Sequence, residues 1–322
     1  MNALALLEPV QPGHLSLPLA LSDVARDFAL DAKAPSTRRA YRDAFADFTG
    51  WCRAHGLQAM PASPESVATY LASLAVAGLS VSTIGQRAAA IRYAHKLAGF
   101  DPPTSHEEVR ATLSGIRRRL GAAPTHRKEP VIAKRLSAML ATCPDTLIGR
   151  RDRALLALGF AGAFRRSELV ALEVSDLAKV DDGLRVTIRR SKTDQEGQGQ
   201  EVAIPRGYRL RPVEAVQAWL TAAEISAGPV FRRVYLGGKI GDLPLTPHAV
   251  AVLVKDHARK AGLDPAEFSG HSLRSGFLTS AAESGASIFK MVEVSRHKSV
   301  DTLRGYVRRV DLFKEHAGAA FL

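Results

Sequence analysis

The sequence has few cysteines and no long apolar run. Only two of its 322 residues are cysteine, Cys52 and Cys143, and neither stands in a CxxC or Cys/His pattern. A disulfide framework or a structural zinc site is therefore not expected, and a reducing cytoplasm is the expected compartment. No stretch is apolar and long enough for a transmembrane helix. Residues 1–20 contain Glu8 and three prolines and no basic leader, which predicts an N-terminal arm instead of a signal peptide.

Acidic residues are in the minority. Lys and Arg number 44 against 32 Asp and Glu, which gives a net charge of +12 and a pI near 10.0. This balance favours polyanionic partners, because each phosphate that a cation neutralises releases condensed counterions. Ribosomal, membrane-surface and nucleic-acid proteins share it, so it indicates a kind of partner and not an activity. The hydrophobic fraction of 46% is sufficient to build cores, and the length suits two domains.

Residues 21–120 have helical periodicity in successive stretches separated by short turns, which predicts a compact helical domain. The first stretch has Ser36 or Thr37 as its expected N-cap. The second begins with Ser63 as its expected N-cap and Pro64 in the first turn.

Residues 121–130 contain prolines and basic residues and few apolar ones, which predicts an interdomain linker. Residues 131–322 then form the second predicted domain, again largely helical. Alternating apolar residues at 184–190 and 201–204 flank a polar turn and predict a β-hairpin. The expected fold class is mainly α with a small β-hairpin or sheet (α+β).

Two places in the second domain carry charged side chains that a structural element would not need. Arg165 directly follows an apolar run, and Glu168 lies three residues on, on the same face of a predicted helix. Such an arginine is a rigid phosphate ligand that the carboxylate can orient; a surface ion pair is the alternative. Lys192 lies at the predicted hairpin tip, where it is either a proton donor or an ordinary solvated lysine.

Two further places carry candidate groups. His271 and Arg274 lie three residues apart at a predicted helix start, a position that favours an oxyanion; a structural histidine is the alternative. Tyr306 follows His297 by nine positions among basic residues. A tyrosine with its ordinary pKa of about 10 is a weak nucleophile. Neighbouring cations would favour the phenolate, whereas a packed tyrosine on a basic helix is the alternative.

The order Arg, Lys, His-x-x-Arg, His, Tyr resembles the tyrosine recombinase (phage integrase) family. The stretches that carry this resemblance are "FRRSEL", "RSKT", "GHSLR", "SRHKS" and "TLRGYV". The family's arginine precedes its Glu-Leu pair by three residues, which selects Arg165 over Arg166. The residue before the second histidine is usually glycine in this family. Here it is Arg296, which could add a phosphate contact or reshape the loop.

The resemblance implies an N-terminal helical core-binding (SAM-like) domain followed by a tyrosine recombinase catalytic domain. It also implies a reaction without metal or other cofactor, in which Tyr306 attacks a DNA phosphodiester and forms a 3′-phosphotyrosine with a free 5′-hydroxyl. Arg165 and Arg274 would hold the non-bridging oxygens.

The remaining roles also follow from the resemblance. Lys192 would protonate the 5′-oxygen, His271 would accept the proton of Tyr306, and His297 would hydrogen-bond the phosphate. Glu168 would support Arg165 and His271. No ATP would be needed, because the bond energy stays in the protein–DNA linkage.

Double-stranded DNA is the expected partner. In the helical domain the expected DNA-facing residues, with a solvated basic face as the alternative, are Arg38, Arg39, Arg42, Gln86, Arg87, Arg92 and Lys96. The resemblance further implies a homotetramer on two short inverted-repeat sites. Its tails, residues 311–322, would pack into neighbouring subunits, with packing within the same chain as the alternative. The implied location is the bacterial cytoplasm at the nucleoid, with no membrane contact.

Two other functions remain open on the sequence alone. One is a type IB topoisomerase-like DNA relaxase, which shares the chemistry. The other is a non-catalytic DNA-binding regulator, which would not need to keep the nucleophile, the lysine and both histidines. The compact helical domain and the segment after Tyr306 favour the recombinase over the relaxase.

Overall fold

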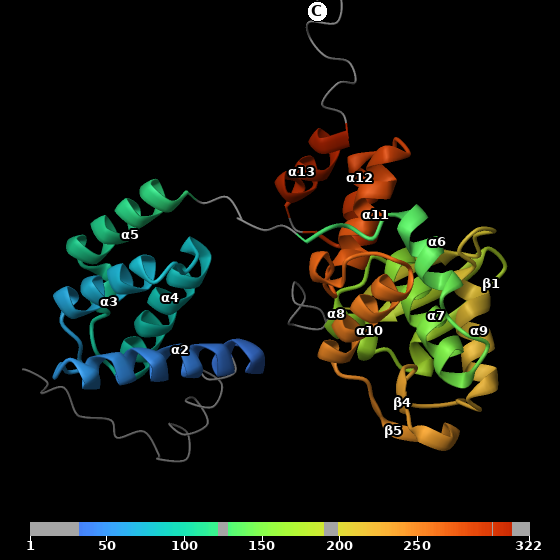
Figure 1. The fold of residues 1–322 in the computed structure, drawn as a ribbon, viewed down its shortest axis with the longest axis horizontal. Coiled ribbons are helices and arrows are strands. Elements are labelled where there is room, and N and C mark those ends of the chain that lie inside the picture. Colours follow the sequence, from blue (N-terminus) through green and yellow to red (C-terminus); the bar gives the residue numbers. More distant parts are fainter. Residues whose placement is uncertain (1–31, 122–127, 190–198, 298, 311–322) are drawn as a thin grey trace, which may run out of the picture. The chain divides into compact units, whose positions relative to one another are not determined.

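The computed structural model describes residues 32–121, 128–189, 199–297 and 299–310, without the side chains of 302 and 308–310 (Figure 1). The predicted arm 1–20, most of the linker 121–130, Lys192 and the tail 311–322 lie outside the described residues. The chain divides into two compact units, Met1–Thr125 and His126–Leu322, and each is described by itself.

The first unit is a helical bundle. Its helices are α2 (Pro35–Ala54), α3 (Pro64–Val76), α4 (Val81–Leu97) and α5 (Glu107–Leu120), with a 3₁₀ turn, η1 (Pro103–Ser105). α2 packs on α4 and α3 packs on α5, and the fully buried Phe48, Leu71 and Ile91 lie in the core between them.

Of the two N-caps predicted for this bundle, one is confirmed and the other is wrong. The Ser63 cap of α3 is confirmed, since its side chain accepts from the backbone N–H of Ser66. The prediction of Ser36 or Thr37 as N-cap of α2 is wrong. That helix already begins at Pro35, because the fixed φ of proline suits the first helical position.

The second unit is also mostly helical. Its α-helices are α6 (Ala133–Ala141), α7 (Leu147–Ala161), α8 (Arg166–Val170), α9 (Pro212–Ala222), α10 (Pro247–Lys260), α11 (Ser272–Glu283), α12 (Ile288–Ser295) and α13 (Val300–Val310). Its 3₁₀ turns are η2 (Val174–Asp176), η3 (Leu236–Gly238) and η4 (Pro265–Glu267). The apolar α7 runs through the core, where Leu155 and Leu158 are fully buried together with Trp219 of α9 and Val254 of α10. The predicted fold class, mainly α with a small sheet, is confirmed.

The predicted hairpin belongs to a three-stranded antiparallel sheet of β1 (Leu177–Val180), β2 (Gly183–Ile188) and β3 (Gln200–Pro205), in the order β1-β2-β3. The alternation that predicted β2 and β3 places Val186 opposite Val202, and both side chains are buried against the helices.

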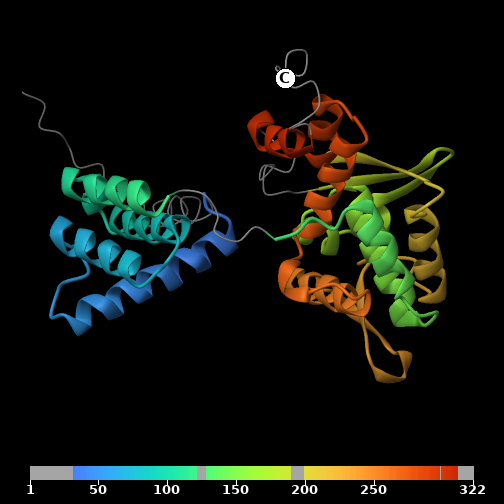
Figure 2. The ribbon, with the colours of Figure 1, turned by 45° about the horizontal axis from the view of Figure 1, so that its top comes forward.

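Three features were not predicted from the sequence. They are the edge strand β1, the short antiparallel pair of β4 (Arg232–Val234) and β5 (Ile240–Pro244), and α12. Figures 1 and 2 show the β4–β5 pair at the end of this unit opposite to α12 and α13.

The chain at residues 129–133 is attached along α11. The backbone N–H of Val131 donates to the carbonyl of Ser272 at 2.9 Å, and the N–H of Ala133 donates to the hydroxyl of Ser280 at 2.9 Å. The contact is close because Gly276 has no side chain; a Cβ there would lie 1.9 Å from the carbonyl oxygen of Val131. This packing fixes α11, which carries two of the candidate site residues at its start.

No helix within the described ranges is both long and apolar enough to cross a membrane.

Replacing Gly276 with alanine should destabilise the second unit by about 1–3 kcal/mol, because the new methyl group meets backbone that cannot rotate away. Urea unfolding followed by circular dichroism measures the change. The control is Gly305→Ala in α13, where a Cβ meets no atom within 4 Å and the midpoint should not fall. A Gly276→Ala midpoint equal to that of the unaltered chain would contradict the prediction.

Candidate functional site

The first candidate cation, Arg165, stands just before α8. The prediction that Arg165 and Glu168 share a helix face is wrong, since Arg165 is the extended N-cap residue (φ −72°, ψ 149°). Glu168 reaches back over the first turn and accepts from the backbone N–H of Arg165 at 2.9 Å and from its Nη1 at 2.5 Å. The neighbouring Arg166 is exposed and lies against Gly270. Of the two arginines, only Arg165 turns inward to the carboxylate.

Glu168 is almost fully buried, with a side chain 1% exposed. Its Oε1 accepts from Arg165, and its Oε2 also accepts from Nη2 of Arg296 at 2.9 Å. Among the described residues its hydrogen bonds go to Arg165 and Arg296, and the implied support of His271 stays a prediction. Glu168 therefore joins two arginines that are far apart in sequence.

The second pair of candidate residues starts α11, as predicted. His271 is its N-cap residue and keeps an exposed side chain, whereas Arg274 in the first turn is 1% exposed. Nη1 of Arg274 donates to the carbonyl of Ala163 at 2.6 Å, and its Nη2 lies 3.3–3.4 Å from the ring nitrogens of His297. Ala163 belongs to the turn just before Arg165, so this bond brings Arg274 next to Arg165.

His297 follows the C-terminus of α12 and is oriented by Ser295. The hydroxyl of Ser295 donates to the carbonyl of Met291 at 2.5 Å and lies 2.8 Å from Nδ1 of His297. Because a hydroxyl has one proton, it accepts from His297, whose Nδ1 then carries the hydrogen. Nε2 is left as the acceptor on the side of Arg274.

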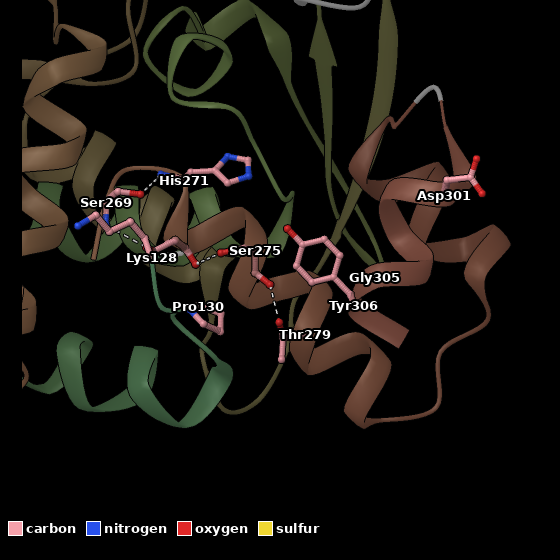
Figure 3. A pocket seen from close by; sticks show the side chains of 10 residues that line it. Lys128, Pro130, Ser269, His271, Ser275, Thr279, Asp301, Gly305 and Tyr306 are labelled. Carbon is pink, nitrogen blue, oxygen red and sulfur yellow. Dashed lines mark hydrogen bonds between the residues drawn. The ribbon is translucent and has the colours of Figure 1, made fainter. Parts of the chain in front are cut away.

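Tyr306 lies in α13 and is half-buried against the small core of Leu278, Met291 and Leu303 that joins α11, α12 and α13. It lines a pocket of about 560 Å³, on whose wall His271, Ser275 and Lys128 also lie. Figure 3 shows His271 and Tyr306 on two sides of this pocket, one from the start of α11 and the other from α13. The tyrosine therefore faces the same space as a histidine that could accept its proton.

The electrostatics of the site are set by burial and by crowding of cations. Burial, and then the charges of Arg165 and Arg296, lower the pKa of Arg274 to about 9. Burial, and then the charge of Arg274, lower the pKa of His297 to about 4. Partial burial, and then the charges of Arg274, Arg166 and Arg165, also lower the pKa of His271. At neutral pH the site therefore holds charged arginines beside neutral histidines, an arrangement that favours an incoming anion.

The carboxylate in this cluster stays ionised. Burial acts to raise the pKa of Glu168, but the charge of Arg296 and the hydrogen bonds from Arg165 outweigh it, and the pKa lies below its ordinary value. Glu168 therefore offsets part of the repulsion between the arginines.

Five of the predicted site residues come together in the second unit around Glu168 and the pocket. These are Arg165, His271, Arg274, His297 and Tyr306. Lys192 follows β2 in sequence and lies outside the described residues. Sequence reasoning did not place Lys128 and Ser275, which line the pocket, or Ser295, which orients His297. It considered Arg296 only as a phosphate contact or a loop change.

The predicted DNA-facing residues of the first unit lie on α2 and α4. Arg39, Arg42, Gln86, Arg92 and Lys96 are exposed, whereas Arg87 lies 3.5 Å from the carboxylate of Asp47 in an ion pair. A hollow of about 470 Å³ has an aromatic lining from Tyr41, Phe45 and Tyr93, and three arginines of the predicted set also line it, Arg38, Arg39 and Arg42. The structure thus brings three of the seven residues together.

The lowered pKa of His297 can be tested in the protein without any substrate. Its ring should titrate near pH 4 in an NMR titration of the imidazole nitrogens, so that it is neutral at pH 7. Arg274→Gln removes the nearest positive charge and should move that pKa upward, only part of the way to the ordinary value of about 6.5, because the ring stays buried. The matched control is Arg259→Gln, which removes an exposed arginine of α10 and should change nothing. Titration of the unaltered His297 near pH 6.5 would contradict the prediction.

Comparison with known proteins identifies the family of the chain. Residues 131–311 match the phage integrase family. An integrase/recombinase xerD homolog of Selenomonas ruminantium is 38% identical over 293 residues, 89% of this chain and 85% of that protein. Recombinase cre of Escherichia phage P1 is 24% identical and covers 82% of this chain and 81% of its own length.

Solved structures share the fold. The Tn1549 transposon integrase in complex with transposon right end DNA superposes with a TM-score of 0.63 at 13% identity, over 89% of this chain and 96% of that one. Because the matches cover most of the chain and bear recombinase names, they favour a recombinase over a relaxase or a regulator. The chain belongs to the phage integrase family, and it is a tyrosine recombinase.

Proposed function

We propose that this recombinase cuts and rejoins double-stranded DNA through a 3′-phosphotyrosine on Tyr306. The observation that carries the proposal is the pocket in which Tyr306 and His271 lie, beside the cluster of Arg165 and Arg274. A nucleophile, a neutral base and two fixed cations are the groups that phosphoryl transfer needs without a metal ion.

In the cleavage step the Tyr306 oxygen forms a bond to phosphorus as the bond from phosphorus to the 5′-oxygen breaks. The proton of Tyr306 passes to His271, whose lowered pKa keeps its ring neutral and able to accept it. Arg165 and Arg274 hold the non-bridging oxygens. Their orientation is fixed before DNA binds, by Glu168 and by the carbonyl of Ala163.

His297 can bind the phosphate once it is protonated. A phosphate anion raises the pKa of the ring, and Nε2 then donates while Nδ1 stays on Ser295. Lys192 gives its proton to the departing 5′-oxygen. Attack of a 5′-hydroxyl of the partner strand on the phosphotyrosine then reverses the chemistry and joins the strands.

The proposed substrate is a pair of short inverted-repeat sites. A related recombinase, XerH, has been solved on palindromic difH substrate in a post-cleavage complex, with a TM-score of 0.57 at 16% identity over 80% of this chain and 72% of that one. The net charge of +12 and the exposed cations of α2 and α4 support contact with a duplex by the domain 21–120. The proposed assembly is a homotetramer in which each tail 311–322 packs into a neighbour.

Tyr306→Phe should abolish the covalent protein–DNA adduct, a loss of more than about a thousandfold, because the nucleophile is removed. The assay uses nicked suicide substrates built from inverted repeats that flank the gene, analysed on a denaturing gel. Tyr208→Phe, which alters an exposed tyrosine, is the control and should form the adduct normally. An undiminished adduct in Tyr306→Phe would rule out this nucleophile, and strand exchange between two duplexes would support recombination over relaxation.

Lys192→Ala should slow cleavage by about 10²–10⁴-fold, the usual range for loss of a proton donor. A substrate with sulfur in place of the bridging 5′-oxygen should restore most of the rate, since a thiolate leaves without protonation. Lys179→Ala, at an exposed lysine of β1, should behave as the unaltered protein on both substrates. If Lys192→Ala cleaves the sulfur substrate as slowly as the normal substrate, Lys192 is not the proton donor.

A further inference from the structure

Arg296 stands at a backbone position that ordinarily favours glycine. It is the C-cap residue of α12, with left-handed angles of φ 57° and ψ 42°. A Cβ makes this conformation unfavourable for most residues, so the arginine side chain needs compensating contacts. Its side chain is only 3% exposed, which places those contacts inside the protein.

The guanidinium of Arg296 is engaged by protein acceptors. Nη1 donates to the carbonyls of Gly162 at 3.0 Å and Val294 at 2.6 Å. Nη2 donates to Glu168 at 2.9 Å and to the carbonyl of Ala163 at 3.2 Å. The group also lies over the ring of Phe164, 5.2 Å from its centre. Because both terminal nitrogens already donate to the protein, the suggestion that Arg296 adds a phosphate contact is not supported.

Two contacts of Arg296 lead to Arg165, one from its side chain and one from its backbone. The carboxylate that Arg296 binds is the one that binds Arg165, with Oε1 on the guanidinium of Arg165 and Oε2 on Arg296. The carbonyl of Arg296 itself accepts from Nη2 of Arg165 at 3.3 Å. Arg165 therefore lies between Glu168 and the backbone of residue 296, and both neighbours depend on where Arg296 sits.

A third contact leads to Arg274. The carbonyl of Ala163 accepts from Nη1 of Arg274 at 2.6 Å and from Nη2 of Arg296 at 3.2 Å. Ala163 has a positive φ of 45°, so its turn is held in an unfavourable conformation for alanine. The two bonds from arginines hold this carbonyl in place.

We propose that Arg296 is a positioning residue for strand cleavage. It holds Arg165 through Glu168 and its own carbonyl, and it holds Arg274 through the shared carbonyl of Ala163. The inference rests on the proposed function of this site, because Arg165 and Arg274 are its phosphate-binding groups. Arg296 acts through them and does not touch the DNA.

The charge of Arg296 supports this role. Glu168 is buried, and the attraction of Arg296 is the largest single effect that lowers its pKa, ahead of each contribution of Arg165. Burial raises the pKa of Glu168 and the charge of Arg296 lowers it. Removing that charge therefore makes the pKa of Glu168 rise. As the pH falls through the raised pKa, Glu168 gains a proton and loses part of its hold on Arg165. Cleavage would then fail at a higher pH than in the unaltered protein.

Arg296→Gly is the direct test, because glycine adopts the left-handed backbone without strain. Single-turnover cleavage of the suicide substrate, measured from pH 5 to 9, should fall about tenfold to a hundredfold at neutral pH. The acid limb of the pH profile should also move to higher pH. The urea midpoint should fall, because the buried Glu168 loses one of its two cations, so cleavage and DNA binding are compared per folded molecule. Arg296→Lys keeps a cation near Glu168 with fewer donors, so it should keep the acid limb and regain part of the rate.

A matched control removes another cation from the same helix. Lys290→Ala alters an exposed lysine of α12 paired with Glu293 and should leave the rate and the pH profile unchanged. If Arg296→Gly cleaves at the normal rate with the normal acid limb, the proposal is wrong. It is also wrong if the rate falls only in proportion to lost folded protein, with the acid limb unmoved, since Arg296 would then be purely structural.

A second measurement does not depend on cleavage. NMR of the arginine side chains in the free protein should show a fixed Arg165 guanidinium, with slow solvent exchange that Arg296→Gly accelerates several-fold. If the unaltered protein forms no adduct on Tyr306, the proposed function fails while this measurement can still support the coupling. An adduct with unchanged Arg165 exchange in Arg296→Gly overturns the positioning role and leaves the proposed function standing.

Discussion

The catalytic unit depends on one buried carboxylate. Glu168 is nearly inaccessible to solvent, yet it stays ionised because Arg165 and Arg296 both donate to it. An unpaired charge at this depth would cost several kcal/mol. The arginines in turn would repel one another without it. Each of these three residues is therefore stable inside the protein only because the other two are present.

The fold brings these charges together from distant parts of the sequence. Arg165 and Glu168 come from the start of α8, Arg274 from the start of α11, and Arg296 and His297 from the end of α12. The backbone at the turn before α8 provides acceptors, because the carbonyl of Gly162 accepts from Arg296 and that of Ala163 accepts from both Arg296 and Arg274. The apolar core around α7 fixes this turn, and the chain at Val131 fixes α11 through the space that Gly276 leaves. A cluster of like charges can be held in this way because the scaffold around it is rigid before any phosphate arrives.

Much of this could be predicted from the sequence, for local reasons. Alternating apolar residues predicted β2 and β3, and the Ser63-Pro64 pair predicted the start of α3. The β4–β5 pair could not be predicted, because its strands are only three and five residues long and "IGDLP" does not alternate. The N-cap of α2 was placed at Ser36 or Thr37 because cap preference was weighed above the preference of Pro35 for the first helical position.

The sequence by itself determined which chemical groups are present and in what order, from Arg165 to Tyr306, and that order was sufficient to indicate the family. Only the tertiary structure decided the orientation, the burial and the pKa values of those groups. It made Arg165 an N-cap residue, lowered the pKa values of His271 and His297, and turned Arg296 inward to Glu168. The physical reason is that protonation and orientation depend on lost hydration and on distances of a few ångströms. Folding sets those distances between residues more than a hundred positions apart, and no local pattern encodes them.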